Sequence, residues 1–454
     1  MASTRASAAA SESEVQPAPT SLRGLLKQLG PGLIITAIIV GSGELIVTPK
    51  LGSEVGFRLL WFIILGCLVK VFVQIELGRY TITRGQTTLA ALNTLPGPRL
   101  VVSWVLWLWL AMFICLVPQV AGLVGGVATA LRLGGVPVPL PWMAVLIGAS
   151  CAVLLVAGRY RMVEAISMLL VGAFVLTTLV AVGALQFTPY AVTGAQLADG
   201  MSFHLPADLA TAFGAFGVIG VGASELIFYP YWCLEKGYAR KIGADDGSAA
   251  WRARAAAWLR VMRIDAWVSF ALYTTTTVAF YLLGAAILHA KKLTVGNDNM
   301  IDTLSFMYRE AFGEWSLPVF VIGAIAVLYS TIFGATASNA RLWVDALGLF
   351  RVKRYRDEAE RTLWLKLGCV VLPVAFVSVY LIVGNPVKLV FWGAIAQGLM
   401  LPFLAGAALY FHHTSAHREL RAGPISVASL WIAASLMTAL GGYQILTGIR
   451  SWIG

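Results

Sequence analysis

Two glutamates stand inside apolar segments of this chain, each within nearly the same ten-residue motif. The first is Glu44 in "VGSGELIVTP", and the second is Glu225 in "VGASELIFYP", which starts 181 residues later. A carboxylate at the centre of a membrane span costs about 2.5–3.5 kcal/mol on insertion scales, so such a residue usually has a function. Two carboxylates at equivalent depths are the ligands that a hard divalent cation such as Mg²⁺ or Mn²⁺ prefers.

The residues around both glutamates are small and favour an interrupted helix. Each glycine costs a helix about 1 kcal/mol relative to alanine. Backbone groups that leave helical geometry are tolerated in a bilayer only inside protein or against a water-filled cavity. The alternative is close helix packing at the small residues, with a glutamate paired to Lys70 in the next span. The candidate binding residues are therefore Gly41, Ser42, Gly43, Glu44, Gly222, Ala223, Ser224 and Glu225.

The composition is that of a membrane protein with many spans. Of 454 residues, 59% are hydrophobic and 12% are charged, whereas soluble domains carry about 25% charged residues. The net charge of +11 does not indicate nucleic-acid binding, because the basic residues fall between the apolar segments. Apolar stretches long enough to cross a bilayer predict eleven spans, at about 31–50, 57–79, 100–130, 141–157, 162–186, 208–235, 264–290, 316–347, 361–384, 386–411 and 425–450.

The loop charges predict the orientation. Lys and Arg are roughly three times as frequent on the side that includes the N-terminus, which the positive-inside rule assigns to the cytoplasm. We expect a disordered cytoplasmic tail over residues 1–23, because this stretch is polar and alanine-rich. The basic loops at 236–263 and 351–361 are expected to form short interfacial helices.

The distance between the two motifs predicts an internal repeat. Five spans separate the first glutamate motif from the second, so the two halves have opposite orientations in the membrane. Opposed halves with interrupted first helices are typical of transporters that bind substrate between those helices. We assign residues 24–207 to the first repeat, residues 208–412 to the second, and residues 413–454 to an extra C-terminal transmembrane helix.

Most of residues 24–412 resembles the Nramp divalent-metal transporters. The similarity is carried by "GPGLIITAIIVGSGELIVTP", "GFRLLW", "LGRYTITRGQTTLA", "YSTIFGATASNARLWVDALGL" and "GLMLPFLAGAALYF". The resemblance implies an all-α protein with the LeuT-type fold, which has two five-helix inverted repeats, broken helices 1 and 6, and about eleven transmembrane helices here.

The departures from the family fall at its metal site. The family's Asp-Pro-Gly-Asn motif of span 1 is replaced by Gly41-Ser42-Gly43-Glu44. The Met-Pro-His motif of span 6 is replaced by Ser224-Glu225-Leu226, which removes a thioether. The acidic pair of span 3 falls on Gln119 and Gly122, and the span 10 glutamine falls on Ala394, with Gln397 one turn further on. The resemblance therefore implies a site for harder ions, in which Glu44 or Glu225 would carry any coupled proton.

These observations predict a secondary transporter that moves a divalent cation of the Mg, Mn and Fe class by alternating access. The alternative is a carrier of amino acids or other organic substrates, because glycine-rich interrupted helices also bind carboxylates. We expect no enzyme, since motifs such as HExxH and GxSxG are absent from the sequence.

The remaining expectations concern the transport path and the setting of the protein. Four residues are candidates for the pathway or a gate: Glu76, Arg79, Gln119 and Gln397. The alternative for Glu76 and Arg79 is an ordinary surface pair three residues apart. We expect no resident cofactor, with the divalent cation as substrate and protons as possible coupled ions. The lipid bilayer is the expected environment, and the protein is expected to be a monomer in a bacterial inner membrane.

Overall fold

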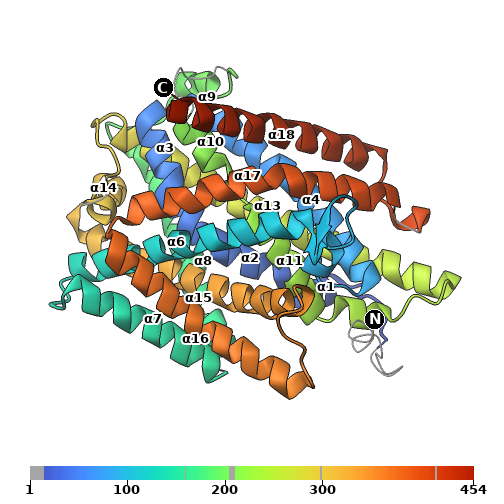
Figure 1. Cartoon of the computed structure of the whole chain (residues 1–454). Helices are drawn as coiled ribbons and strands as arrows, with labels where there is room; N and C mark the ends of the chain where they lie inside the picture. Colours follow the sequence, from blue (N-terminus) through green and yellow to red (C-terminus); the bar gives the residue numbers. More distant parts are fainter. Residues whose placement is uncertain (1–14, 159, 204–209, 297–298, 415–416, 454) are drawn as a thin grey trace.

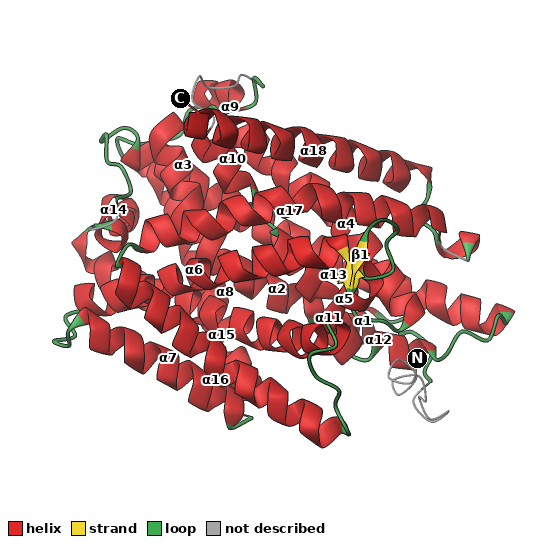
Figure 2. Cartoon of the chain, viewed as in Figure 1, coloured by secondary structure: helices red, strands yellow, loops and turns green. Residues whose placement is uncertain are grey.

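The computed structural model describes residues 15–158, 160–203, 210–296, 299–414 and 417–453. In this part of the chain the protein is an all-α bundle whose long helices run side by side (Figures 1 and 2). Nine helical segments within the described residues are long and apolar enough to cross a membrane, and Leu140–Val156 is a shorter apolar helix. The helix α1 and the end of α18 lie at opposite ends of the bundle (Figure 1), which agrees with an odd number of crossings.

The elements follow one another with short connections. The first part contains α1 (Leu22–Gln28), α2 (Pro31–Ile39), η2 (Val40–Val47), α3 (Thr48–Val55), α4 (Leu60–Arg84), α5 (Thr88–Leu92), β1 (Arg99–Leu100), β2 (Val102–Ser103), α6 (Trp104–Leu133), α7 (Leu140–Val156), α8 (Tyr160–Ala184), η3 (Leu185–Phe187) and α9 (Gly194–Gly200). The second part contains α10 (Ala210–Phe216), α11 (Ala223–Glu235), α12 (Tyr238–Ile242), α13 (Ala249–Leu283), η4 (Gly284–Leu288), α14 (Met300–Phe312), η5 (Glu314–Ser316), α15 (Leu317–Leu349), α16 (Glu358–Val383), α17 (Pro386–Thr414), η6 (Arg418–Leu420) and α18 (Pro424–Ile453).

The two predicted interruptions take different forms. Span 6 is broken outright, because α10 ends at Phe216 and α11 begins at Ala223 with non-helical chain between them. Span 1 stays helical throughout, but its centre is the π-helix η2, which contains the whole "VGSGELIV" motif. A π-helix is a widened helical turn that is frequent at functional sites. The break in span 1 is thus a change of helical pitch, rather than an unwound segment.

The short helices predicted in the basic loops are present only in part. The first loop contains one, α12 (Tyr238–Ile242). Residues 249–263 do not form a separate interfacial helix, because α13 begins at Ala249 and continues into the predicted span 7. Asp265, which the sequence suggests as the start of that span, lies inside α13 and binds the N-terminus of α2 instead. Its carboxylate accepts hydrogen bonds from the N–H groups of Gly30 at 2.9 Å and Gly32 at 2.7 Å. In the second basic loop, residues 351–357 form turns between α15 and α16.

The predicted disordered tail does not extend to residue 23. Residues 1–14 lie outside the described residues. From Val15 onward the chain packs on α12 and α13, where the Gln16 N–H donates to the Lys241 carbonyl at 3.0 Å. The Gln16 carbonyl in turn accepts from the Trp258 indole at 2.9 Å.

The packing at the centre of the bundle depends on glycines where backbones approach closely. A Cβ on Gly41 of η2 would lie 2.0 Å from the Thr331 hydroxyl of α15, and one on Gly217 would lie 1.9 Å from the Ala394 carbonyl of α17. Any larger residue at either position would have to displace a neighbouring helix. These two contacts place η2 against α15 and the break in span 6 against α17, so that the two motifs face a common interior.

Candidate functional site

Glu44 is completely buried at the centre of the bundle. Its Oε1 atom accepts a hydrogen bond from the Thr277 hydroxyl of α13 at 2.5 Å and from the Gly220 N–H in the break of span 6 at 3.2 Å. Its Oε2 atom is buried and has no hydrogen-bond partner in the protein. A buried unpaired polar atom costs about 1–3 kcal/mol, and more for a charged group. One oxygen of the carboxylate is therefore held by hydrogen bonds, while the other has no partner in the protein.

Glu225 lies in the first turn of α11, close to the broken end of the helix. It is 7% exposed, and its carboxylate is within reach of the Ser224 hydroxyl and of the Gly222 N–H. Negative charge is favourable at a helix N-terminus, because the helix dipole and the free N–H groups both attract it. A Cβ on Gly222 would lie 2.5 Å from Glu225 Oε2, and Glu44 accepts from the N–H of Gly220, so both predicted carboxylates lie at the break in span 6.

A chain of polar side chains fixes the start of α11. The Gln397 side-chain oxygen of α17 accepts from the Ser224 N–H at 2.9 Å and from the Ser224 hydroxyl at 2.8 Å. The Gln397 amide nitrogen donates to the Gln119 side-chain oxygen of α6 at 2.9 Å. Two candidate pathway residues thus connect to the candidate site through Ser224, across three helices.

Lys70 of α4 is also fully buried here, but it forms no ion pair with either carboxylate within the described residues. Its ammonium donates to the carbonyl of Phe216, at the end of α10, and to the carbonyl of Ile219 at 2.7 Å. It also lies 4.4 Å from the centre of the Phe216 ring. The alternative suggested by the sequence, a direct Lys70–glutamate pair, is therefore wrong, although the charge of Lys70 does interact with both glutamates.

Further polar atoms near Lys70 and Glu44 lack protein partners. Both side-chain atoms of Gln74, one turn along α4 from Lys70, are buried and unpaired, as is the Tyr273 hydroxyl of α13. A Cβ on Gly220 would touch both Cys67 of α4 and Tyr273, so the break in span 6 lies between these two helices. Buried polar groups of this kind usually bind water or a ligand.

The small residues of the motifs form the walls of the site. A Cβ on Gly43 would lie 2.5 Å from the Val218 carbonyl, and one on Gly222 would lie 2.4 Å from the Gln397 side chain. Ala223 is fully buried as the first residue of α11. Gly41 packs against Thr331 and Val327 of α15, and the side chain of Ser42 lies outside the described part of the structure.

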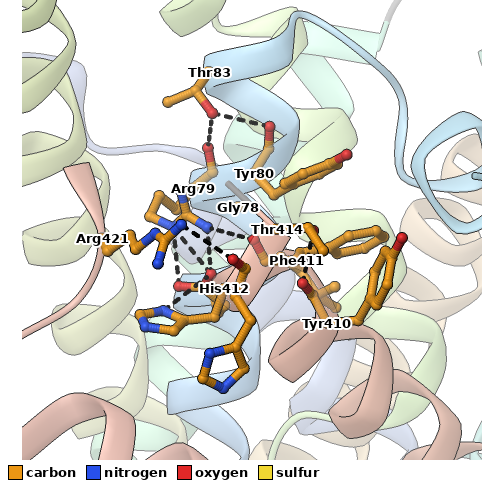
Figure 3. Close-up of polar contacts among 12 residues, drawn as sticks. Gly78, Arg79, Tyr80, Thr83, Tyr410, Phe411, His412, Thr414 and Arg421 are labelled. Carbon is orange, nitrogen blue, oxygen red and sulfur yellow. Dashed lines mark hydrogen bonds and ion pairs between the residues drawn. The ribbon is translucent and has the colours of Figure 1, made fainter. Parts of the chain in front are cut away.

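Glu76 and Arg79 form a buried ion pair rather than a surface pair. Arg79 Nε donates to both carboxylate oxygens of Glu76 at 3.0 Å, and the side chains are 3–4% exposed. The Arg79 guanidinium also donates to the Phe411 carbonyl at 3.2 Å, and His412 Nδ1 lies 3.6 Å from Glu76. Figure 3 shows Arg79 beside Phe411 and His412, with Arg421 nearby. The pair therefore connects α4 to the end of α17.

A cation bound at Glu44 would have a limited set of protein ligands. No group of three or more His, Cys, Asp or Glu side chains in the described residues could hold a metal ion. A metal ion would need backbone carbonyls, hydroxyls or water in addition to Glu44 and Glu225, which is the ligand set of hard cations. The sequence missed Thr277, Gly220 and the role of Lys70, because their contacts depend on how three distant segments meet.

Comparison with known proteins places the chain in a family. The profile described as "Natural resistance-associated macrophage protein-like" matches residues 32–447. The uncharacterized protein PM0681 of Pasteurella multocida is 26% identical over 72% of each chain, and the divalent metal cation transporter MntH of Deinococcus radiodurans is 23% identical over 94% of this chain and 91% of its own.

The fold comparison agrees with the sequence comparison. A manganese transporter of Eremococcus coleocola superposes with a TM-score of 0.73 at 16% identity, covering 97% of this chain and 90% of its own. The bundle thus has the LeuT-type fold that the sequence predicts. Because the family profile spans most of the chain, from Gly32 in α2 to Thr447 in α18, this protein belongs to the Nramp family.

Proposed function

We propose that this protein is a secondary transporter for a divalent cation of the Mg, Mn and Fe class, and that the cation binds between η2 and α11. The observation that carries the proposal is the Oε2 atom of Glu44, which is buried and unpaired beside the broken helix. Relatives named as a manganese transporter and as MntH support the substrate class. The absence of a thioether at Ser224 favours harder ions over soft transition metals.

In this proposal the cation crosses by alternating access between the two sides of the membrane. Residues 24–207 and 208–412 form the two inverted halves, and residues 413–454 form the extra helix. The N-terminus is cytoplasmic, the protein is a monomer in a bacterial inner membrane, and Glu44 or Glu225 carries any coupled proton. Support for the halves comes from the matching glutamate motifs at the start of each half.

The test is uptake of Mn²⁺, Mg²⁺ and Ca²⁺ into proteoliposomes, together with isothermal titration of the same ions on purified protein. We expect Glu44→Gln to lose at least tenfold in affinity, because the neutral amide offers the ion no negative charge. The matched control is Glu314→Gln, which removes a carboxylate that is 75% exposed. Equal affinities in wild type and Glu44→Gln would contradict the proposed site. Repeating the uptake with and without a pH gradient tests proton coupling.

A carrier of organic substrates is the second candidate, and Lys70 is the observation that favours it. A buried ammonium beside the site leaves two carboxylates balanced by one fixed positive charge, which weakens the attraction for a divalent ion. The positive end of the α11 helix dipole could instead attract a substrate carboxylate. Thermal stabilisation of the purified protein by amino acids, with none by Mn²⁺ or Mg²⁺, would favour this candidate.

A further inference from the structure

Lys70 is held by the broken end of a helix. Its side chain is completely buried, and its Nζ atom contacts the carbonyls of Phe216 and Ile219 and the face of the Phe216 ring. Among the described residues it forms no ion pair with an acidic side chain, so backbone oxygens are its direct partners. Exposed lysines rarely need such a site, because water satisfies the ammonium group.

The Phe216 carbonyl is the last one of α10, and the Ile219 carbonyl lies three residues further on, in the non-helical chain of the break. The last carbonyls of a helix have no partner within it, and the helix dipole adds negative potential at that end. The N–H groups of Val218 and Ile219 both donate to Ala215, which leaves the oxygens of Phe216 and Ile219 to Lys70. Glu44 lies close by, because its carboxylate accepts from the N–H of Gly220, the residue after Ile219.

Backbone oxygens, an aromatic face and nearby carboxylates form the environment that binds small monovalent cations and primary ammonium ions. We propose that the ammonium of Lys70 is a tethered cation, which permanently fills a monovalent cation site at the end of α10. The protein therefore needs no free Na⁺ or K⁺ to hold the break in span 6. Removal of the side chain should leave a site that takes a soluble monovalent or alkylammonium ion.

This inference is independent of which substrate the protein carries. It concerns the oxygens of Phe216 and Ile219, whereas the proposed substrate site uses the free oxygen of Glu44. The Lys70 proposal is tested by protein stability in the absence of any divalent ion. A negative result in that test would leave the proposed transport of a divalent cation unaffected. The reverse also holds, because loss of metal binding in Glu44→Gln says nothing about Lys70.

The test is chemical rescue of Lys70→Ala, in which the deleted atoms correspond to n-propylammonium. The full-length protein is purified in detergent and its thermal unfolding is followed in choline, Na⁺, K⁺, n-propylammonium or tetramethylammonium chloride at equal ionic strength. We expect the midpoint of the wild type to be the same in choline, Na⁺ and K⁺. We expect Lys70→Ala to unfold several degrees lower in choline and to recover saturably with n-propylammonium, Na⁺ or K⁺, but not with tetramethylammonium, which has no N–H group.

Lys241→Ala is the matched control. Lys241 also donates to an uncharged oxygen, that of the Gln28 side chain at 2.8 Å, and lies 4.7 Å from the Trp258 ring. It is only partly buried, so water fills the space in the variant and no saturable rescue is expected. The same rescue in both variants would overturn the proposal, because it would reflect a general salt effect.

A second variant covers the case in which Lys70→Ala does not fold. Lys70→Met keeps much of the apolar side-chain volume and removes the ammonium, so it should unfold well below the wild type. If Lys70→Met unfolds at the same midpoint temperature as the wild type, the proposal is overturned, because the ammonium would then contribute nothing to stability. Failure of every monovalent cation to stabilise a folded Lys70→Ala would overturn it as well.

Discussion

The two oxygens of Glu44 have different environments, and this difference defines the candidate site. Oε1 is fixed by the Thr277 hydroxyl and the Gly220 N–H, whereas Oε2 is buried without a partner. The carboxylate is therefore oriented before any ligand arrives, which lowers the cost of binding.

Thr277→Val tests this orienting role. The valine has nearly the same shape but no hydroxyl, so Glu44 loses a charge-assisted hydrogen bond of about 1.5–3 kcal/mol. We expect the affinity for the transported ion to fall about tenfold or more, with little effect on folding. Titration of the purified protein with Mn²⁺ or Mg²⁺ measures this affinity.

The control is Thr276→Val at the neighbouring position. Thr276 is equally buried, but its hydroxyl donates only to the Leu272 carbonyl of its own helix at 2.8 Å. Equal effects of the two substitutions would show that Glu44 does not depend on Thr277.

At the scale of elements, a close backbone contact sets the distance between the break in span 6 and α17. Gly217 lies so close to α17 that a Cβ would come within 1.9 Å of the Ala394 carbonyl and 2.6 Å of the Gly398 nitrogen. Backbone atoms cannot move aside as a flexible side chain can. The first residue after α10 therefore determines how near α17 can lie.

Gly217→Ala should accordingly be strongly destabilising. We expect a lower thermal midpoint and a larger aggregated fraction in size-exclusion chromatography, because α17 must shift to relieve the overlap. Gly406→Ala in α17 is the control, since nothing lies within 4 Å of a Cβ at that position. That change should be neutral or stabilise the helix by up to about 1 kcal/mol. A Gly217→Ala variant as stable as Gly406→Ala would show that α17 is not held by this contact.

For the whole molecule, the buried Glu76–Arg79 pair connects α4 to the far end of α17. The pair is desolvated, and Arg79 also bonds to the Phe411 carbonyl. Breaking a buried ion pair leaves an uncompensated charge and typically costs about 3–5 kcal/mol.

We therefore expect Glu76→Gln to lower the thermal midpoint of the whole protein by several degrees. Glu314→Gln breaks the exposed ion pair with Arg309. Such a pair contributes about 0–1 kcal/mol to stability, so this variant should unfold close to the wild-type temperature. Differential scanning fluorimetry in detergent compares the two. If both variants unfold at the wild-type temperature, the pair does not hold the two helices together.

The sequence predicts the parts of the fold that depend on local patterns. Apolar length locates the spans, and the repeated motif identifies both Glu44 and Glu225 as members of one buried region. The sequence does not indicate the length of α13, because its first fifteen residues are basic and alanine-rich, and hydropathy excludes them although the helix continues. The contacts of Lys70 are a second feature that the sequence does not indicate. Its burial could be expected, but its partners are backbone oxygens that any sequence would supply.

The contacts of α13 have a consequence for motion in the bundle. Asp265, Ser269 and Thr277 lie on one stripe of the helix, and they bind in turn the N-terminus of α2, the Gly32 carbonyl and Glu44. This stripe is about 18 Å long at 1.5 Å per residue, and it follows α2 and η2 along most of their length. A slide of one segment past the other would break all of these bonds at once. These bonds oppose such a slide, so we expect α13 to tilt together with α2 and η2.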